Sequence, residues 1–196
     1  MAMNLLGIGL GAANHHEDAL SVKEAELSTM RRLGAPEDDV LVTQSNLAST
    51  YRALGRLDEA MQMRRDVYSA TVKLNGHEHS DTLIEANNYA QALLNLQRFK
   101  EVKEFLREKV RVARRVLGED HELTLMMRGS YAEALCRDPA ATLDDLREAV
   151  TTIEENSRIA RRVLGGAHPA TAGIERDLQK ARAALRARET PPTTES

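Results

Sequence analysis

The sequence has few of the residues that stabilise small secreted proteins and β-sheets. Among its 196 residues there is one cysteine, Cys136, no tryptophan, and only 3% aromatic residues. A single cysteine cannot form an internal disulfide, so a disulfide-stabilised secreted domain is excluded and a reducing compartment, the cytoplasm, is expected. Because aromatic residues are scarce while alanine, leucine and charged residues are abundant, the composition favours helices over sheets.

The sequence also lacks a large excess of charge and a long apolar segment. Lysine and arginine number 27 against 30 aspartate and glutamate residues, so no general basic field attracts nucleic acid or anionic lipid. No run approaches the roughly 18 apolar residues that cross a membrane. The apolar residues 1–13 have no lysine or arginine before them, unlike a secretory signal peptide. We therefore expect neither nucleic acid nor membrane as a partner.

What the sequence does contain is an internal repeat with a period of 42 residues. Residues 46–48, 88–90 and 130–132 read Asn-Leu-Ala, Asn-Tyr-Ala and Ser-Tyr-Ala, and the related residues 4–6 lie one period earlier. The next interval is longer than 42 residues, since RVARRVLG at 111–118 recurs as RIARRVLG 47 residues later, at 158–165. The surplus lies in the proline-containing residues 137–145, where either the loop lengthens or the next helix starts early.

A second marker recurs with the same repeat. Charged stretches end in leucine and glycine, and three of them lead into a His-x-x-Thr segment that begins at His79, His121 or His168. The glycines fit helix ends that require a left-handed backbone. We expect each histidine to form a hydrogen bond with a neighbouring backbone group, and Ser80 or Asp81 to be the N-cap of the helix that follows.

Apolar residues recur at steps of three and four through both halves of each repeat, which is the pattern of amphipathic helices. The sequence therefore predicts nine helices and no strand. The helices are expected at residues 3–13, 16–33, 38–54, 57–74, 80–96, 98–117, 122–136, 142–164 and 168–188.

The repeat resembles the tetratricopeptide repeat in the long form of kinesin light chains. Residues 46–60 read NLASTYRALGRLDEA and match the helix–turn–helix pattern of that family, with Leu47, Ala48, Tyr51 and Ala60 at its packing positions. The usual repeat has about 34 residues. The additional residues lengthen the second helix and add the His-x-x-Thr connection, which is the feature shared with the kinesin-light-chain-like subgroup.

This resemblance implies an all-α fold: a right-handed α-solenoid of about four stacked helical hairpins with a C-terminal capping helix. The repeat domain is expected to cover residues 1–189, followed by a disordered tail at 190–196. Its units are expected near residues 3–37, 38–79, 80–121 and 122–167, with the capping helix at 168–188.

In such arrays the first helix of each hairpin lines a concave groove that binds an extended peptide or a helix of a partner protein. Side-chain amides suit this role because each offers both a donor and an acceptor to a peptide backbone. Members of the family use equivalent asparagines for it, although a single polar residue on a helix can equally be a solvated surface residue. The expected groove residues are Ser45, Asn46, Ser49, Arg52, Asn87, Asn88, Gln91, Asn95, Ser130, Glu133 and Arg137.

No catalytic or metal-binding signature accompanies the repeat. No cysteine or carboxylate cluster completes a zinc spacing with the histidine pairs at 15–16 and 77–79, and Cys136 has no nucleophile motif around it. The alternating glycines at 7–11 follow no strand and lack the spacing of a phosphate-binding loop. We therefore predict a cytoplasmic, non-enzymatic scaffold for a protein or peptide ligand, with no cofactor and no metal.

Two alternatives stay open. The N-terminal helix has Leu5, Leu6, Ile8 and Leu10 with almost no charge, so two copies could associate through that face as a homo-oligomer. The chain could also be a fragment of a larger multidomain signalling or adaptor protein.

Overall fold

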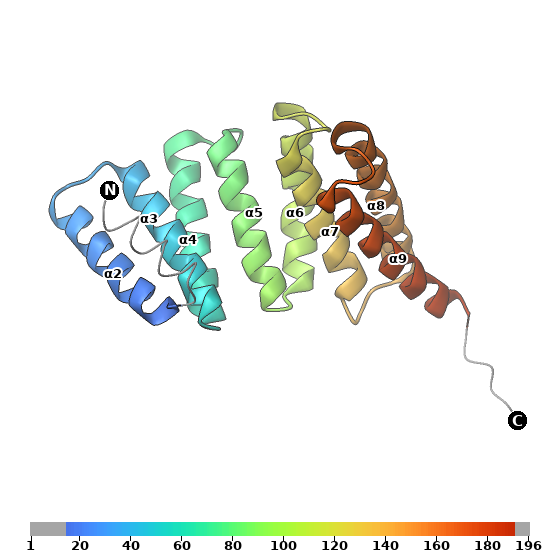
Figure 1. The fold of residues 1–196 in the computed structure, drawn as a ribbon, viewed down its shortest axis with the longest axis horizontal. Helices are drawn as coiled ribbons and strands as arrows, with labels where there is room; N and C mark the ends of the chain where they lie inside the picture. The colour runs from blue at the N-terminus through green and yellow to red at the C-terminus, as the bar shows by residue number, and fades with distance from the viewer. Residues whose placement is uncertain (1–14, 191–196) are drawn as a thin grey trace, which may run out of the picture. The chain divides into compact units, whose positions relative to one another are not determined.

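The computed structural model of the protein describes residues 15–190, which form eight α-helices and no strand (Figure 1). The all-α prediction is thus confirmed for these residues. The predicted helix 3–13 and nearly all of the predicted tail lie outside them. The chain divides into two compact units, the first ending at Leu96 and the second beginning at Gln97.

The first unit contains four helices, each packed against the next in sequence. These are α2 (His16–Arg32), α3 (Glu37–Ala53), α4 (Leu57–Asn75) and α5 (Ser80–Asn95). Leu20, Leu27 and Leu47 form a buried cluster between α2 and α3, and partly buried residues such as Tyr51 and Met63 pack against it.

The second unit also contains four consecutive helices. They are α6 (Phe99–Val116), α7 (Glu122–Arg137), α8 (Leu143–Leu164) and α9 (Pro169–Glu189). Helix α7 packs between α6 and α8 and also contacts α9, while α8 packs along α9. The eight predicted helices within the described residues are confirmed, and their ends agree with the structure to within one residue.

The three repeated histidines are the N-caps of α5, α7 and α9. In His79, His121 and His168 the Nδ1 atom accepts a hydrogen bond from the backbone N–H two residues later, at 3.3, 3.2 and 3.2 Å respectively. The predicted hydrogen bond between these histidines and the backbone is confirmed. The prediction that Ser80 or Asp81 caps α5 is wrong, because the imidazole at position 79 already satisfies the free N–H group.

The threonine of each His-x-x-Thr segment lies in the first helical turn and is buried. Thr82 Oγ1 donates a hydrogen bond to the carbonyl oxygen of Thr71 at 3.5 Å, and Thr171 Oγ1 donates to that of Gly165 at 2.9 Å. The histidine therefore starts the first helix in all three motifs, and in two of them the threonine ties that start to the end of the preceding second helix, whereas the buried Thr124 Oγ1 has no such partner.

Glycine ends the second helices, as predicted. Gly76 and Gly165 are the C-caps of α4 and α8 and have φ angles of 85° and 88°. Their N–H groups donate to the carbonyl oxygens of Val72 and Arg161, at 2.9 and 3.1 Å. A side chain at such a φ would be strained, so glycine is the residue that reaches this turn at least cost.

The surplus residues of the third repeat are divided between a longer connection and a longer helix. Residues 138–142 join α7 to α8, whereas residues 54–56 suffice between α3 and α4, and α8 has 22 residues where α6 has 18. Thr142 is the N-cap of α8 and forms a capping box with Asp145. The Thr142 hydroxyl accepts a hydrogen bond from the Asp145 backbone N–H at 3.1 Å, and the Asp145 carboxylate accepts one from the Thr142 backbone N–H at 2.9 Å. Both ways of absorbing the surplus are therefore used.

Replacing His121 with alanine is expected to lower the free energy of unfolding by about 1 kcal/mol, because the substitution removes the N-cap acceptor of α7. His121→Asn is the matched control, since asparagine supplies a side-chain oxygen at the same place and should lose much less. Urea denaturation followed by circular dichroism compares the two variants. Equal losses in both would contradict the capping role.

Candidate protein-binding surface

Two first helices, α3 and α5, approach each other in the first unit. Ser45 Oγ donates a hydrogen bond to Glu85 Oε1 at 2.9 Å, which links the two helices directly. Asn46 and Asn88 occupy the same repeat position on these helices, and both side chains are partly exposed. The structure thus places two of the predicted amide groups on neighbouring helices with access to solvent.

Ser45 and Ser49 are also held by a network that joins three helices. Arg64 of α4 donates hydrogen bonds to both hydroxyls and forms an ion pair of 3.4 Å with Glu85. The side chains of Arg64 and Glu85 are mostly buried. Burial lowers the pKa of the Arg64 guanidinium, and the Glu85 carboxylate opposes that shift. These two serines therefore stabilise the packing of α3, α4 and α5 and are less available to a ligand than the amides beside them.

The remaining predicted residues of the first unit differ in accessibility. Arg52 and Asn95 are exposed near the ends of α3 and α5, and Gln91 is partly exposed. Asn87, in contrast, is only 4% exposed. Asn87, which was expected to line the groove, is therefore buried and does not present its amide to a ligand.

The predicted residues of the second unit lie on α7. Ser130 is 4% exposed, and its Oγ donates a hydrogen bond to the carbonyl oxygen of Met126 at 3.0 Å, so it does not present a free hydroxyl at the surface. Glu133 and Arg137 form an ion pair of 2.5 Å, and the Arg137 guanidinium lies 5.3 Å from the centre of the Phe99 ring. The charges of Glu133 and Arg137 are thus already paired with each other.

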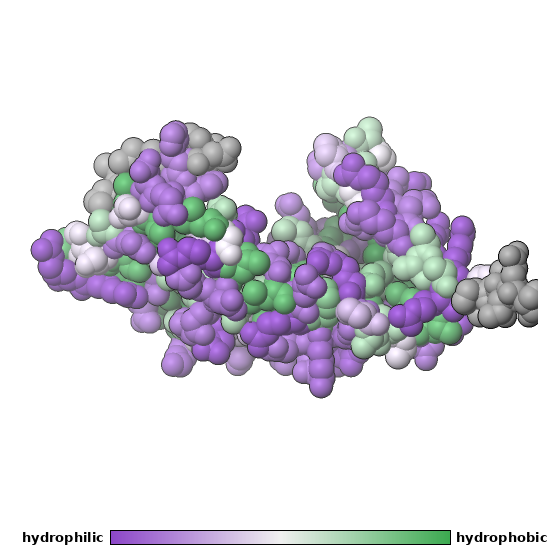
Figure 2. Space-filling model, turned by 90° about the horizontal axis from the view of Figure 1, so that it is seen from below, coloured by the Kyte–Doolittle hydropathy of each residue, from purple (hydrophilic) through white to green (hydrophobic). Residues whose placement is uncertain are grey.

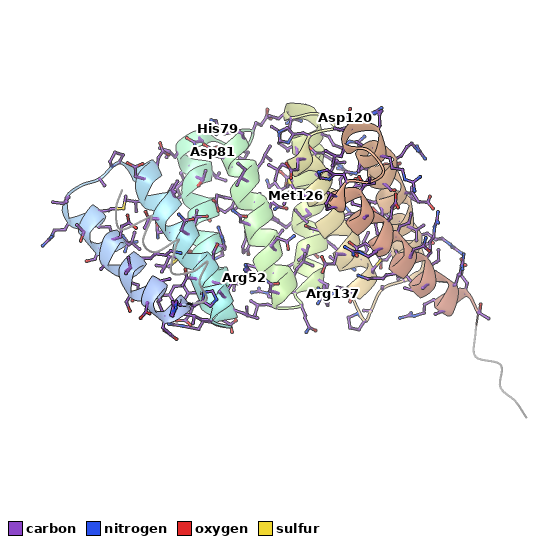
Figure 3. All side chains as sticks on the ribbon, viewed as in Figure 1. Arg52, His79, Asp81, Asp120, Met126 and Arg137 are labelled. Carbon is purple, nitrogen blue, oxygen red and sulfur yellow. The ribbon has the colours of Figure 1, made fainter. Side chains whose placement is uncertain are left out.

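The sequence interpretation missed an exposed apolar position on the first helices. Val42, Ile84 and Met126 are separated by 42 residues and are 55%, 45% and 49% exposed (Figure 3 labels Met126). A signal for them was present in the sequence, because each lies outside the buried stripe of its helix and yet recurs with the repeat. Figure 2 shows one face of the molecule, which is mostly hydrophilic with hydrophobic residues scattered among the polar ones.

Cys136 is poorly suited to nucleophilic chemistry. Burial raises the pKa of its thiol to about 11, with the carboxylates of Asp177 and Glu133 adding to the shift, so the thiol is protonated at neutral pH. Within residues 15–190, no three side chains of histidine, cysteine, aspartate or glutamate are grouped so that they could hold a metal ion. In the same range no helix has the length and apolar character needed to span a membrane.

Comparison with known proteins agrees with this geometry. Residues 40–81 and 86–122 match the family model of the tetratricopeptide repeat. A crystal structure of a single-residue variant of a Podosopora anserina protein, described as a kinesin light chain with nearly identical TPR-like repeats, superposes with a TM-score of 0.81 at 22% identity. That match covers 96% of this chain and 87% of the other. No curated protein matches the sequence significantly.

Two further solved structures have the same fold. Another crystal structure of the Podosopora anserina repeats gives a TM-score of 0.72 at 20% identity and covers 100% of this chain and 96% of that one. The crystal structure of BtubC (BKLC) from P. vanneervenii also gives 0.72, at 18% identity, with 99% and 83% covered.

The fold is therefore an α-solenoid built from consecutive helical hairpins. The two matched segments are tetratricopeptide repeats, and the described residues have the fold of the kinesin light chain-like repeats. The resemblance inferred from the sequence is confirmed. The tetratricopeptide-repeat fold generally mediates protein–protein interaction.

Proposed function

We propose that this protein is a non-enzymatic interaction module that binds an extended or helical segment of a partner protein on its first helices. The observation on which the proposal depends is the placement of Asn46 and Asn88. They share a repeat position, lie on the neighbouring helices α3 and α5, and are both accessible. Each amide offers one donor and one acceptor to a peptide backbone, so the pair suits a ligand bound through its main chain.

The charged residues near this face favour a partner of mixed charge. Arg52 is exposed at the end of α3 and can bind a carboxylate of the ligand, whereas the exposed Asp38 and Asp39 of the same helix repel a strongly acidic one. The proposal needs no cofactor or metal, and the single cysteine is consistent with a cytoplasmic location.

The experiment that tests the proposal is substitution of the two amides. Asn46→Glu combined with Asn88→Glu should weaken binding of a partner by at least about tenfold, because the longer carboxylates remove both donors and repel peptide carbonyl groups. Ser69→Glu, which introduces the same carboxylate at an exposed position of α4, is the control and should leave binding intact. Binding of partners captured by crosslinking is measured by titration calorimetry. Unchanged affinity in the double variant would reject this face as the binding surface.

A further inference from the structure

The exposed apolar residues of the first unit are not explained by folding. Val42 and Ile84 remain about half exposed, so a large part of each apolar side chain faces solvent and adds nothing to the stability of the fold. Both are β-branched, and β-branched residues form helices less readily than alanine. Alanine at either position would favour the helix itself, yet a partly exposed apolar β-branched residue is present on both helices.

These two residues lie close to the direct link between α3 and α5. Val42 precedes Ser45 by three residues and Asn46 by four, so it shares their side of α3, and Ile84 precedes Asn88 by four residues and shares its side of α5. One turn further along each helix are Asn46 and Asn88. The apolar pair and the amide pair thus belong to one continuous surface of the first unit.

The charges on this surface are separated by sign. Exposed aspartates lie one turn before the apolar pair: Asp38 and Asp39 on α3, and Asp81 on α5. Arg52 lies at the opposite end of the surface from Asp81 (Figure 3). Among residues 15–190, no ion pair holds Asp38, Asp39 or Arg52, so these charges can meet a ligand.

We infer that the partner of this surface is a peptide segment whose apolar side chains pack against Val42 and Ile84. Basic residues of the peptide flank this apolar part on the side of the aspartates, and acidic residues flank it on the side of Arg52. The inference rests on the proposed function and adds the chemistry of the ligand. A uniformly acidic segment would be repelled by the three aspartates, and a uniformly basic one by Arg52. The fixed order of the two charges also sets the direction in which the segment binds.

A displayed library of random 12-residue peptides, selected against the full chain, tests this inference. The selected peptides are expected to have apolar residues between a basic flank and an acidic flank, always in one order. Ile84→Ser should weaken the best selected peptide by at least tenfold. Val163→Ser, which changes an equally exposed apolar residue on α8, is the matched control and should not alter the affinity. Arg52→Glu should remove the preference for the acidic flank.

The outcomes separate the two proposals. If no peptide is enriched, the proposed function fails and this inference fails with it. If peptides are enriched and lose binding with Asn46→Glu and Asn88→Glu but not with Ile84→Ser or Arg52→Glu, the proposed function holds and this inference is overturned. Enrichment of peptides with a single sign of charge also overturns it.

Discussion

Replacing Ala132 with phenylalanine is expected to destabilise the second unit by about 2–3 kcal/mol. Ala132 is completely buried on α7, which packs between α6 and α8. Alanine also occupies the equivalent positions 48 and 90, where it is equally inaccessible. A small residue at this position lets helices approach closely, so a phenyl ring can be accommodated only if the helices move apart and lose contacts on both sides.

Gln179→Phe is the matched control for this prediction. Position 179 on α9 corresponds to 132 after the longer interval, but the structure exposes it, and glutamine replaces alanine there. The control is expected to change stability by no more than about 0.5 kcal/mol. Urea denaturation monitored by circular dichroism measures both variants. If the two lose the same stability, close packing at the alanine position is not the cause.

Replacing Leu47 with alanine is expected to lower the stability of the first unit by about 2–5 kcal/mol. Leu47 is buried in the cluster with Leu20 and Leu27, so the substitution removes apolar contacts and leaves a cavity between α2 and α3. In a solenoid each helical hairpin contacts only its neighbours, and the damage should therefore be local.

Hydrogen exchange measures where the Leu47→Ala variant loses protection. The amides of α2 and α3 are expected to exchange faster, while those of α8 keep the protection they have in the unaltered protein. Leu47→Met, which nearly conserves the volume, should cost less than about 1.5 kcal/mol. Equal loss of protection in α3 and α8 would show that the array unfolds as a single cooperative unit, contrary to this prediction.

The helices were predictable because their start and stop signals recur with the repeat. Glycine at 76 and 165 fixes where second helices end, and the His-x-x-Thr segments fix where first helices begin. The role of the histidine side chain could be anticipated only in part. A hydrogen bond to the backbone was expected, but serine and aspartate are such common N-caps that position 80 or 81 was preferred over His79.

Accessibility of the candidate surface was harder to predict. The repeat period indicates which residues are equivalent, but it does not indicate what the neighbouring helix covers. Asn88 and Ser130 share a repeat position, yet the asparagine is partly exposed and the serine is buried. Similarly, the link of Ser45 to Arg64 and Glu85 joins three helices and depends on side chains far apart in sequence. Such covering depends on three-dimensional packing, which spacing alone does not encode.

The connection between α7 and α8 explains how the repeats can differ in length without loss of the fold. Lys103 Nζ lies 2.8 Å from Asp138 and 3.8 Å from Asp145, so one lysine fastens both ends of the connection to α6. The capping box between Thr142 and Asp145 then fixes the start of α8, whatever the length of the connection before it. Length variation can therefore accumulate at this bend during evolution, while the helices on either side keep the faces that they present to their neighbours.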